Sequence, residues 1–479
     1  MSDPHSFQRL RPVGYLEKFS TARHLAEFYH NVAASAYYSK PKSSYPLEAL
    51  VYRALATVIA RHPVLSAITV DDHKSNPYFV RMPRIDLRHA VRFVTRTKEH
   101  DDHDDTTDEE LDEILQEEHN RNFKDGYGER PFWRFIVLHE TESSTHFAGC
   151  FVFHHALGDG KSGLAFHRSF LDALSAIPDS TEPDLEADPI VYPPRKDLLQ
   201  ALERVHPLPL SIPYMLRALW NDWFPRVPQT CWTGGRVSTA PSTRTRNHNV
   251  TLPRGTTLGL LSAARANRTT LTATFETLLA ASVLAHLPPE RYSSLRCLCP
   301  VSMRPLLPST LVDDDSIGCW VTHVENTHHR PAESSTKGKA MDLFSWDDAR
   351  RVRATFETEL GKNGKDTPVG LLPYAGNLNR WFEKKVGKPR DASFEISNVG
   401  VFKPLARPSS PEGGETWEIS RMIFSHSADV TGPPFQVSLV TGGDGRLTVS
   451  FCWLHGAVEE EWMKKVIEEL INAIEEVAQ

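Results

Sequence analysis

Residues 151–160 read FVFHHALGDG and combine an apolar run, two histidines and a Gly-Asp-Gly turn. Histidine is the side chain whose proton affinity suits general-base catalysis near neutral pH. The apolar residues predict a strand, so His155 is expected at its end rather than inside the core. We therefore interpret His155 as a candidate general base. The alternative is a turn histidine that only hydrogen-bonds backbone groups.

The neighbours of His155 are given different roles. Strand alternation points His154 to the opposite face, so His154 is expected to pack in the core. Asp159 lies between two glycines, four residues after His155, and is expected to hold the shape of the turn. Adjacent histidines on a regular strand cannot face one metal ion, and no HExxH motif occurs. We predict no metal site.

Two other motifs resemble this segment but fail on spacing. GDGKS is similar to the end of a phosphate-binding loop, which needs a glycine five residues before Gly160, where the chain has His155. The sequence GKSG also lacks the GxSxG pattern of a hydrolase nucleophile elbow. Neither nucleotide phosphate binding nor a serine nucleophile is predicted here.

Simple elements would position the histidine. Alternation predicts strands over 131–140 and 146–155, and residues 162–176 have the spacing of an amphipathic helix. Further strands are expected at 393–402, 417–425, 435–441 and 446–454, with helices at 11–38, 269–290 and 459–477. Eight prolines between residues 178 and 213 indicate a linker. We predict an N-terminal lobe (1–180), a linker or crossover (181–245) and a C-terminal lobe (246–479).

The 479 residues carry 54 Lys and Arg against 61 Asp and Glu, a net charge of −7 that argues against a nucleic-acid binder. Twelve of the acids lie between residues 99 and 118, where Thr107 and Glu110 predict a helix start and residues 99–105 a solvated loop. No apolar run is long enough to span a membrane, and no signal peptide is evident. Six cysteines without a disulfide framework indicate a reducing, cytoplasmic environment.

The chain also resembles a known superfamily, the CoA-dependent acyltransferases. HHALGDG is similar to their HxxxDG motif, and PFWRFIVL to the strand before it. CPVSMRPLLP with IGCWVTHV resembles their arginine-bearing strand and Gly-aromatic segment. FEISNVGVF, WEISRMIFSHS and LTVSFCWLHGAVEEE resemble the C-terminal lobe of fungal alcohol acetyltransferases. The blocks span nearly the whole chain. The plant BAHD branch is disfavoured, because SNVG stands where that branch has DFGWG.

This resemblance implies an α/β fold of two chloramphenicol-acetyltransferase-like lobes, each a mixed sheet covered by helices, with a tunnel at the lobe interface. His155 would take the proton from an acceptor hydroxyl. Asp159 would pair with Arg304 of PVSMRP and so fix the catalytic turn. Acetyl-CoA or another acyl-CoA would be the co-substrate, and no permanently bound cofactor is expected.

Four further residues are candidates for substrate or CoA binding. Gly158 and Gly160 would admit close approach of substrate to the backbone. Ser397 and Asn398 of SNVG would donate hydrogen bonds to the tetrahedral oxyanion. The alternative for Ser397 and Asn398 is a structural role in a loop.

We therefore expect a monomeric O-acyltransferase that acetylates a small alcohol or secondary metabolite. The first alternative is a condensation-type enzyme or N-acyltransferase with an amine acceptor or a carrier-bound donor. A non-catalytic binding protein of the same fold and a hydrolase are further alternatives. Intact His155 and Asp159 count against the binding protein.

Overall fold

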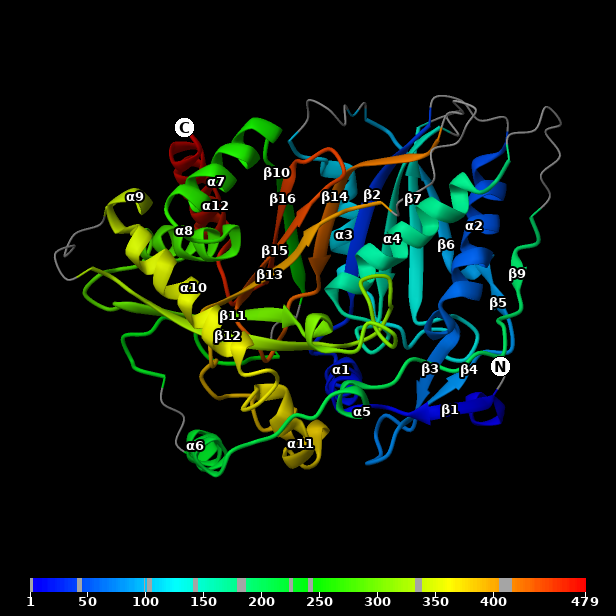
Figure 1. Ribbon diagram of the computed structural model, residues 1–479, viewed down its shortest axis with the longest axis horizontal. Helices are drawn as coiled ribbons and strands as arrows, with labels where there is room; N and C mark the ends of the chain where they lie inside the picture. The colour runs from blue at the N-terminus through cyan, green and yellow to red at the C-terminus, as the bar shows by residue number, and fades with distance from the viewer. Residues whose placement is uncertain are drawn as a thin grey trace.

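The computed structural model describes residues 3–40, 45–98, 100, 106–140, 145–178, 187–223, 227–239, 244–331, 338–404 and 416–479. Two mixed sheets, each with helices packed on it, stand side by side (Figure 1). The two-lobed α/β architecture expected from the sequence is therefore confirmed. The tunnel between the lobes stays a prediction. Most of the acidic loop expected at 99–105 lies outside the described residues.

The first sheet has five strands, in the order β14-β2-β8-β7-β6. Their bounds are Glu418–His426, Val32–Ser39, His146–Phe153, Trp133–His139 and Val91–Thr95. All neighbours are antiparallel except β6 and β7. Strand β8, which leads to His155, is thus a central strand and is held on both sides.

Helices α2 (Leu47–Arg61) and α4 (Gly160–Ser175) pack together on one face of this sheet (Figure 1). The apolar stripe of α4 reaches the core, where Phe166 stacks on Phe151 of β8 with ring centroids 3.7 Å apart. The lobe also contains α1 (Tyr15–Leu25) and α3 (Glu109–His119). Helix α3 is capped by Asp108, whose side chain accepts from the Leu111 N–H. The prediction that Thr107 caps it was wrong by one residue.

Two small sheets complete the first lobe. One has the order β1-β4-β3 (Gln8–Pro12, Tyr78–Arg81 and Ala67–Val70), and the other pairs β5 (Ile85–Asp86) with β9 (Ile190–Val191). The strand β2 lies in a segment for which the sequence pattern predicted helix. All but the last of its residues are buried, so it has no alternation of polar and apolar positions. A helical spacing was wrongly inferred there.

The second sheet has six strands, in the order β10-β16-β15-β13-β11-β12. Their bounds are Thr245–Thr251, Leu447–Leu454, Phe435–Thr441, Phe394–Val401, Ser294–Ser302 and Val321–His329. Helices α7 (Arg254–Ala266), α8 (Leu271–Ala285), α10 (Trp346–Gly361) and α12 (Glu460–Ala478) pack in the same lobe. Helix α8 is apolar on nearly all sides, and every residue from Ala273 to Ala285 is buried.

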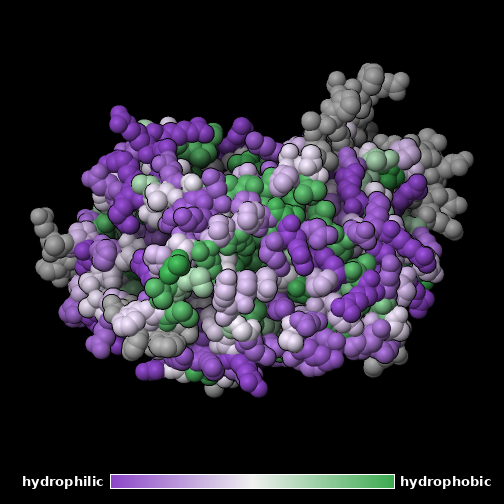
Figure 2. Space-filling view, turned by 60° about the horizontal axis from the view of Figure 1, so that its bottom comes forward, coloured by the Kyte–Doolittle hydropathy of each residue, from purple (hydrophilic) through white to green (hydrophobic). Residues whose placement is uncertain are grey.

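The shorter helices are α5 (Leu202–Val205), α6 (Ile212–Trp223), α9 (Ala340–Leu343) and α11 (Leu378–Glu383). The face that carries α6 shows hydrophobic patches among hydrophilic areas (Figure 2), and Ile212, Leu216, Leu219 and Trp220 of α6 are exposed. In the described part of the chain, no helix is both long and apolar enough to cross a bilayer.

Strand β14 comes from the C-terminal half of the chain but belongs to the first sheet. Its residues belong to the segment assigned from sequence to the C-terminal lobe, yet it pairs with β2 at the edge of the first sheet. It also packs against β15 and β16 of the second sheet. The lobe boundaries at 181 and 246 stay a prediction, but the first sheet is not built from the N-terminal segment alone.

The two faces of the second sheet differ in chemistry. Apolar residues such as Phe394, Ile396 and Val437 pack under the helices of their lobe. The alternate positions face the other way and form a polar row across four paired strands: Glu395, Gln436, Cys452 and Asn247. On the same face of β13, Val399 joins the core of the first lobe. This polar face is therefore turned toward the first lobe.

Candidate active site

The turn that carries His155 joins β8 to α4 and is fixed by a helix cap. Asp159 is the N-cap residue of α4, and its Oδ1 accepts from the Ser162 N–H at 3.1 Å. The Ser162 hydroxyl in turn accepts from the Asp159 N–H at 3.2 Å, which completes a capping box. The start of α4 thus holds the turn in place from within its own lobe.

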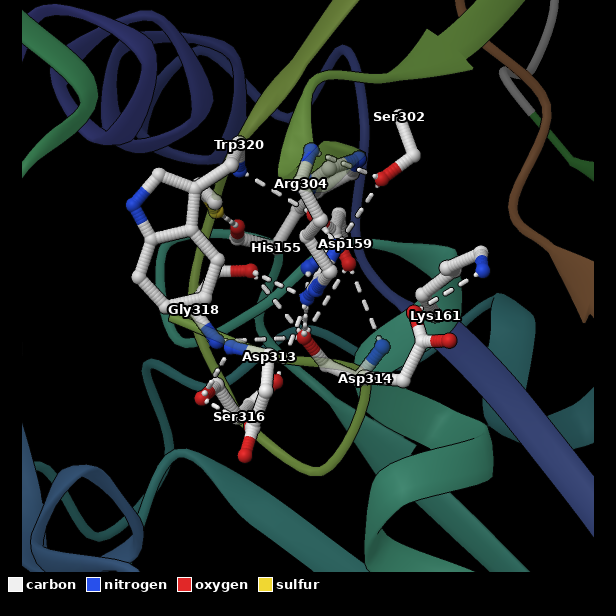
Figure 3. A network of polar contacts seen from close by, with 12 residues as sticks. His155, Asp159, Lys161, Ser302, Arg304, Asp313, Asp314, Ser316, Gly318 and Trp320 are labelled. Atoms are coloured by element: carbon white, nitrogen blue, oxygen red, sulfur yellow. Dashed lines mark hydrogen bonds and ion pairs between the residues drawn. The ribbon is translucent and has the colours of Figure 1, made fainter. Parts of the chain in front are cut away.

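The other carboxylate oxygen of Asp159 binds the second lobe. Arg304 donates from Nη1 to Oδ2 at 2.7 Å, and the Trp320 N–H donates to the same oxygen at 3.1 Å. The side chains of Asp159 and Arg304 are 1% and 3% exposed. Figure 3 shows Arg304 and Trp320 converging on Asp159. Burial opposes ionisation, but the Arg304 guanidinium and the Trp320 N–H hold the pKa of Asp159 below its usual value.

A second set of contacts fixes the backbone of the turn. The Asp159 N–H donates to the Gly318 carbonyl at 3.1 Å, and the Ser162 hydroxyl donates to the same oxygen at 3.0 Å. The Cys319 thiol donates to the His155 carbonyl at 2.9 Å. Sequence reasoning missed the parts played by Ser162 and Cys319. The spacing of Asp159 and Ser162 is that of a capping box, and this signal was present in the sequence.

The His155 ring is half-buried beyond the end of β8. Its Nδ1 has no hydrogen-bond partner among the described residues apart from its own carbonyl. Burial lowers the pKa of His155 to about 4, and the positive charge of Arg23 acts in the same direction. The imidazole is therefore neutral at pH 7. Where Nδ1 carries the proton, Nε2 has a free lone pair that can accept one.

His154 packs in the core, as alternation predicted. It is 1% exposed, and its ring stacks on Phe132 with centroids 5.0 Å apart. Its Nδ1 accepts from the Ala156 N–H at 2.9 Å. The four tryptophans in strand-like segments, Trp133, Trp320, Trp417 and Trp453, are all buried as well.

Close packing around the turn leaves no space for a side chain at Gly158 or Gly160. A Cβ on Gly160 would lie 2.6 Å from Cγ1 of Val399, and one on Gly158 would lie 2.6 Å from Cβ of Ser162. Protein atoms therefore occupy the space that a side chain would need. A role of either glycine in substrate binding stays a prediction.

Ser397 and Asn398 differ in how free their side chains are. Asn398 donates from Nδ2 to the Thr272 hydroxyl at 2.9 Å and accepts from the Gly400 N–H at 2.9 Å. Ser397 is half-buried, and none of the side-chain hydrogen bonds in the described residues involves its hydroxyl. It lies on the face of β13 that also carries Val399, next to Gly160. Of the two, Ser397 thus has the freer side chain, and a role of either residue at the oxyanion stays a prediction.

The described residues contain no group of three His, Cys, Asp or Glu side chains that could hold a metal ion. A hollow of about 170 Å³ lies elsewhere on the first lobe, and neither His155 nor Asp159 lines it. Two of its arginines, Arg121 and Arg134, form ion pairs with Glu118. The charge of this hollow is partly neutralised, and we assign it no role.

Comparison with known sequences gives consistent results. A family profile described as "Alcohol acetyltransferase" matches residues 12–241. The chain is 33% identical over 466 residues to "Probable alcohol acetyltransferase crmB" of Aspergillus fumigatus, covering 95% of this chain and 96% of that protein. It is 24% identical over 477 residues to "Probable alcohol acetyltransferase FCK4" of Fusarium pseudograminearum, covering 96% and 94%.

Solved structures share the fold. The trichothecene 15-O-acetyltransferase TRI3 of Fusarium sporotrichioides superposes with a TM-score of 0.74 at 12% identity, covering 99% of this chain and 98% of that one. The first condensation domain of the CDA synthetase gives a TM-score of 0.61 at 14% identity, covering 98% and 96%. At these identities the likeness concerns the arrangement of the two lobes.

Proposed function

Because this chain belongs to the alcohol acetyltransferase family, we propose that it transfers an acetyl group from acetyl-CoA to a hydroxyl of a small alcohol, with His155 as the general base. The observation that carries the proposal is the placement of His155. Its ring is neutral and half-buried, and the turn beneath it is held by the buried Asp159–Arg304 pair. A base that is fixed in position but still reachable is what this reaction needs.

The reaction follows from this geometry in two steps. The acceptor hydroxyl gives its proton to Nε2 of His155 while its oxygen attacks the thioester carbonyl, so a C–O bond forms and the carbonyl becomes an oxyanion. The oxyanion then collapses, the C–S bond breaks, and the imidazolium returns the proton to the thiolate of CoA. General-base assistance of this kind contributes about 10²- to 10⁴-fold.

Asp159 does not act on the proton in this scheme. Within the described residues its side-chain partners are Ser162, Arg304 and Trp320, and it makes no hydrogen bond to His155. It is a positioning residue that sets where the imidazole stands. We assign the oxyanion contact to the Ser397 hydroxyl, since the Asn398 amide is already engaged by Thr272.

The test uses purified protein, acetyl-CoA and a panel of primary and secondary alcohols. Release of the CoA thiol, together with the acetyl ester seen by mass spectrometry, is the expected result. Matched amines in place of the alcohols test N-acylation, and acetyl-CoA alone tests hydrolysis. Transfer only to amines, or only from a carrier-bound acyl group, would overturn the proposal.

A further inference from the structure

Glu395 stands in an unusual place for a carboxylate. It lies on β13 within the second sheet, between β15 and β11, with the core residues Phe394 and Ile396 on either side of it in sequence. Strand alternation points its side chain away from that core and toward the first lobe. The side chain nevertheless keeps 24% of its surface exposed. No ion pair or hydrogen bond shorter than 3.8 Å engages this carboxylate among the described residues.

The nearest titratable partner of Glu395 is His426, the last residue of β14. Its Nε2 lies 3.8 Å from Oε1 of Glu395, and its Nδ1 donates to the Ser427 carbonyl at 3.1 Å. That bond places the proton on Nδ1, so Nε2 presents a lone pair to the carboxyl group. Burial lowers the pKa of His426 to about 4, and the ring is neutral at pH 7.

The gap between these two atoms suits one small polar group. At 3.8 Å they are too far apart for a direct hydrogen bond, whereas an oxygen beside them can lie about 2.8 Å from both. Burial and the nearby Asp429 carboxylate raise the pKa of Glu395 to about 7. The carboxyl group can then donate or accept, while Nε2 only accepts. A hydroxyl, which does both, satisfies this pair.

Tyr29 connects the pair to the catalytic base. Its ring centroid is 5.7 Å from that of His155 and 5.8 Å from that of His426. Arg23 lies 4.3 Å from the same ring and forms a 2.7 Å ion pair with Asp429, which fixes the ring in place. The Glu395–His426 pair and His155 therefore lie around one aromatic ring, close enough for a single acceptor molecule to reach both.

We propose that Glu395 and His426 form a subsite for a second hydroxyl of the acceptor, so that the enzyme prefers an alcohol that carries another hydroxyl some carbons from the one it acetylates. This inference rests on the proposed function and names the class of acceptor. Glu395 and His426 are specificity-determining residues in this view. They touch the acceptor away from the reacting atoms.

The experiment compares matched acceptors. Straight-chain 1-alkanols and α,ω-alkanediols of four to eight carbons are assayed with acetyl-CoA, and kcat and KM are obtained for each. At the best chain length the diol should exceed the mono-alcohol in kcat/KM about fivefold to tenfold, after correction for its two equivalent hydroxyls, mainly through KM. In Glu395→Leu and His426→Phe this ratio should fall to about one.

Two further variants separate a binding role from a structural one. Glu395→Gln keeps a group that donates and accepts, so it should restore part of the diol preference. Glu357→Leu removes a glutamate of α10 that pairs with Arg353, and should leave the preference as it is. Equal kcat/KM for diols and mono-alcohols in the parent enzyme would overturn the subsite while the proposed function stands. Absence of acetyl transfer to every alcohol would overturn the proposed function and this inference with it.

Discussion

Arg304 and Asp159 are 145 residues apart in sequence, yet Nη1 of the one lies 2.7 Å from Oδ2 of the other. Each belongs to a different lobe, so the ion pair joins the lobes at the foot of the catalytic turn. Taking one partner away would leave the other charge buried and uncompensated. The loss of stability on removing one partner therefore comes mainly from the unpaired buried charge that remains, rather than from the lost Coulomb energy of the pair.

We expect Asp159→Asn and Arg304→Ala each to lower the free energy of unfolding by about 3–5 kcal/mol and to reduce turnover. The double variant should lose less than the sum, because neither charge is then left alone. Urea unfolding of the four proteins measures the coupling. The Arg61–Asp172 pair has the same 2.7 Å distance with side chains 42% and 30% exposed, and its cycle should give only about 0–1 kcal/mol. Equal coupling in the two cycles would contradict the prediction.

Replacing the two adjacent histidines should separate catalysis from packing. His155→Ala should reduce kcat at least about 10²-fold with little change in Tm, because the ring supplies the base and its removal leaves the turn contacts intact. His154→Ala should instead cost about 2–4 kcal/mol of stability, since it empties a site stacked against Phe132. Steady-state kinetics and thermal unfolding give the two readouts. More than about a tenth of the parent rate in His155→Ala would rule out the general-base role.

Gly160→Ala should weaken the contact between α4 and the strands opposite it. The added methyl would stand 2.6 Å from Val399 and 2.7 Å from Phe424, an overpacking that costs about 1–3 kcal/mol. Gly255→Ala on α7 is the matched control, because among the described residues no atom beyond its chain neighbours and its own helix backbone lies within 4 Å of the added Cβ. Its helical position should make that change neutral or stabilising by up to about 1 kcal/mol. A Tm for Gly160→Ala at or above that of the control would show that the turn accommodates the added methyl group without strain.

Stability should fall at alkaline pH because of His328, which is buried between two carboxylates. Its Nδ1 lies 2.8 Å from Asp348 and its Nε2 lies 3.0 Å from Glu276. Burial alone would lower the pKa of His328, but these two partners raise it to about 9. The unfolded value is about 6.5, so the protonated ring stabilises the fold fully below about pH 6.5. That contribution, about 3 kcal/mol, is lost as the pH rises through about 9.

The measurement is the free energy of unfolding at pH 6, 7.5 and 9 for the parent and for His328→Gln. The difference between them should shrink as the pH rises. His146→Gln, at an exposed position at the start of β8, controls for the general effect of losing a histidine. A difference that stays constant from pH 6 to pH 9 would show that His328 is neutral in the folded protein.

Local patterns predicted part of the elements, including β7, β8 and α4 around the site. The strands β13, β15 and β16 and the helix α12 were predicted to within about two residues at each end, since alternation and an apolar stripe mark them. The strand β2 was missed because both of its faces are buried, so its sequence does not alternate between polar and apolar residues. The place of β14 in the first sheet could not be inferred either. The hydrophobic pattern of a strand indicates which of its faces is buried. It does not indicate that residues 418–426 pair with residues 32–39.

The residues of the candidate site also form two groups, those that could be predicted from the sequence and those that could not. His155 and Asp159 could be predicted because both lie in one short motif of the sequence. Arg304 was assigned to Asp159 through the family resemblance. Glu395 and His426 gave no sequence signal. They stand on different strands and meet only through the placement of β14 over the second sheet. Residues brought together by strand order, rather than by neighbourhood in sequence, require the structure.

The position of β14 has a consequence for how the protein is made. Until residue 426 has left the ribosome, the first sheet lacks its last strand and β2 offers an unpaired edge. Such an edge can pair with other chains. A fragment ending at the proline-rich linker should therefore aggregate, and supplying residues 416–479 alone should not rescue it, because β15 and β16 need β13 and β11 to complete their own sheet. We therefore expect the two halves of this chain to complete their folding together, after residue 426 has been synthesised, rather than one after the other.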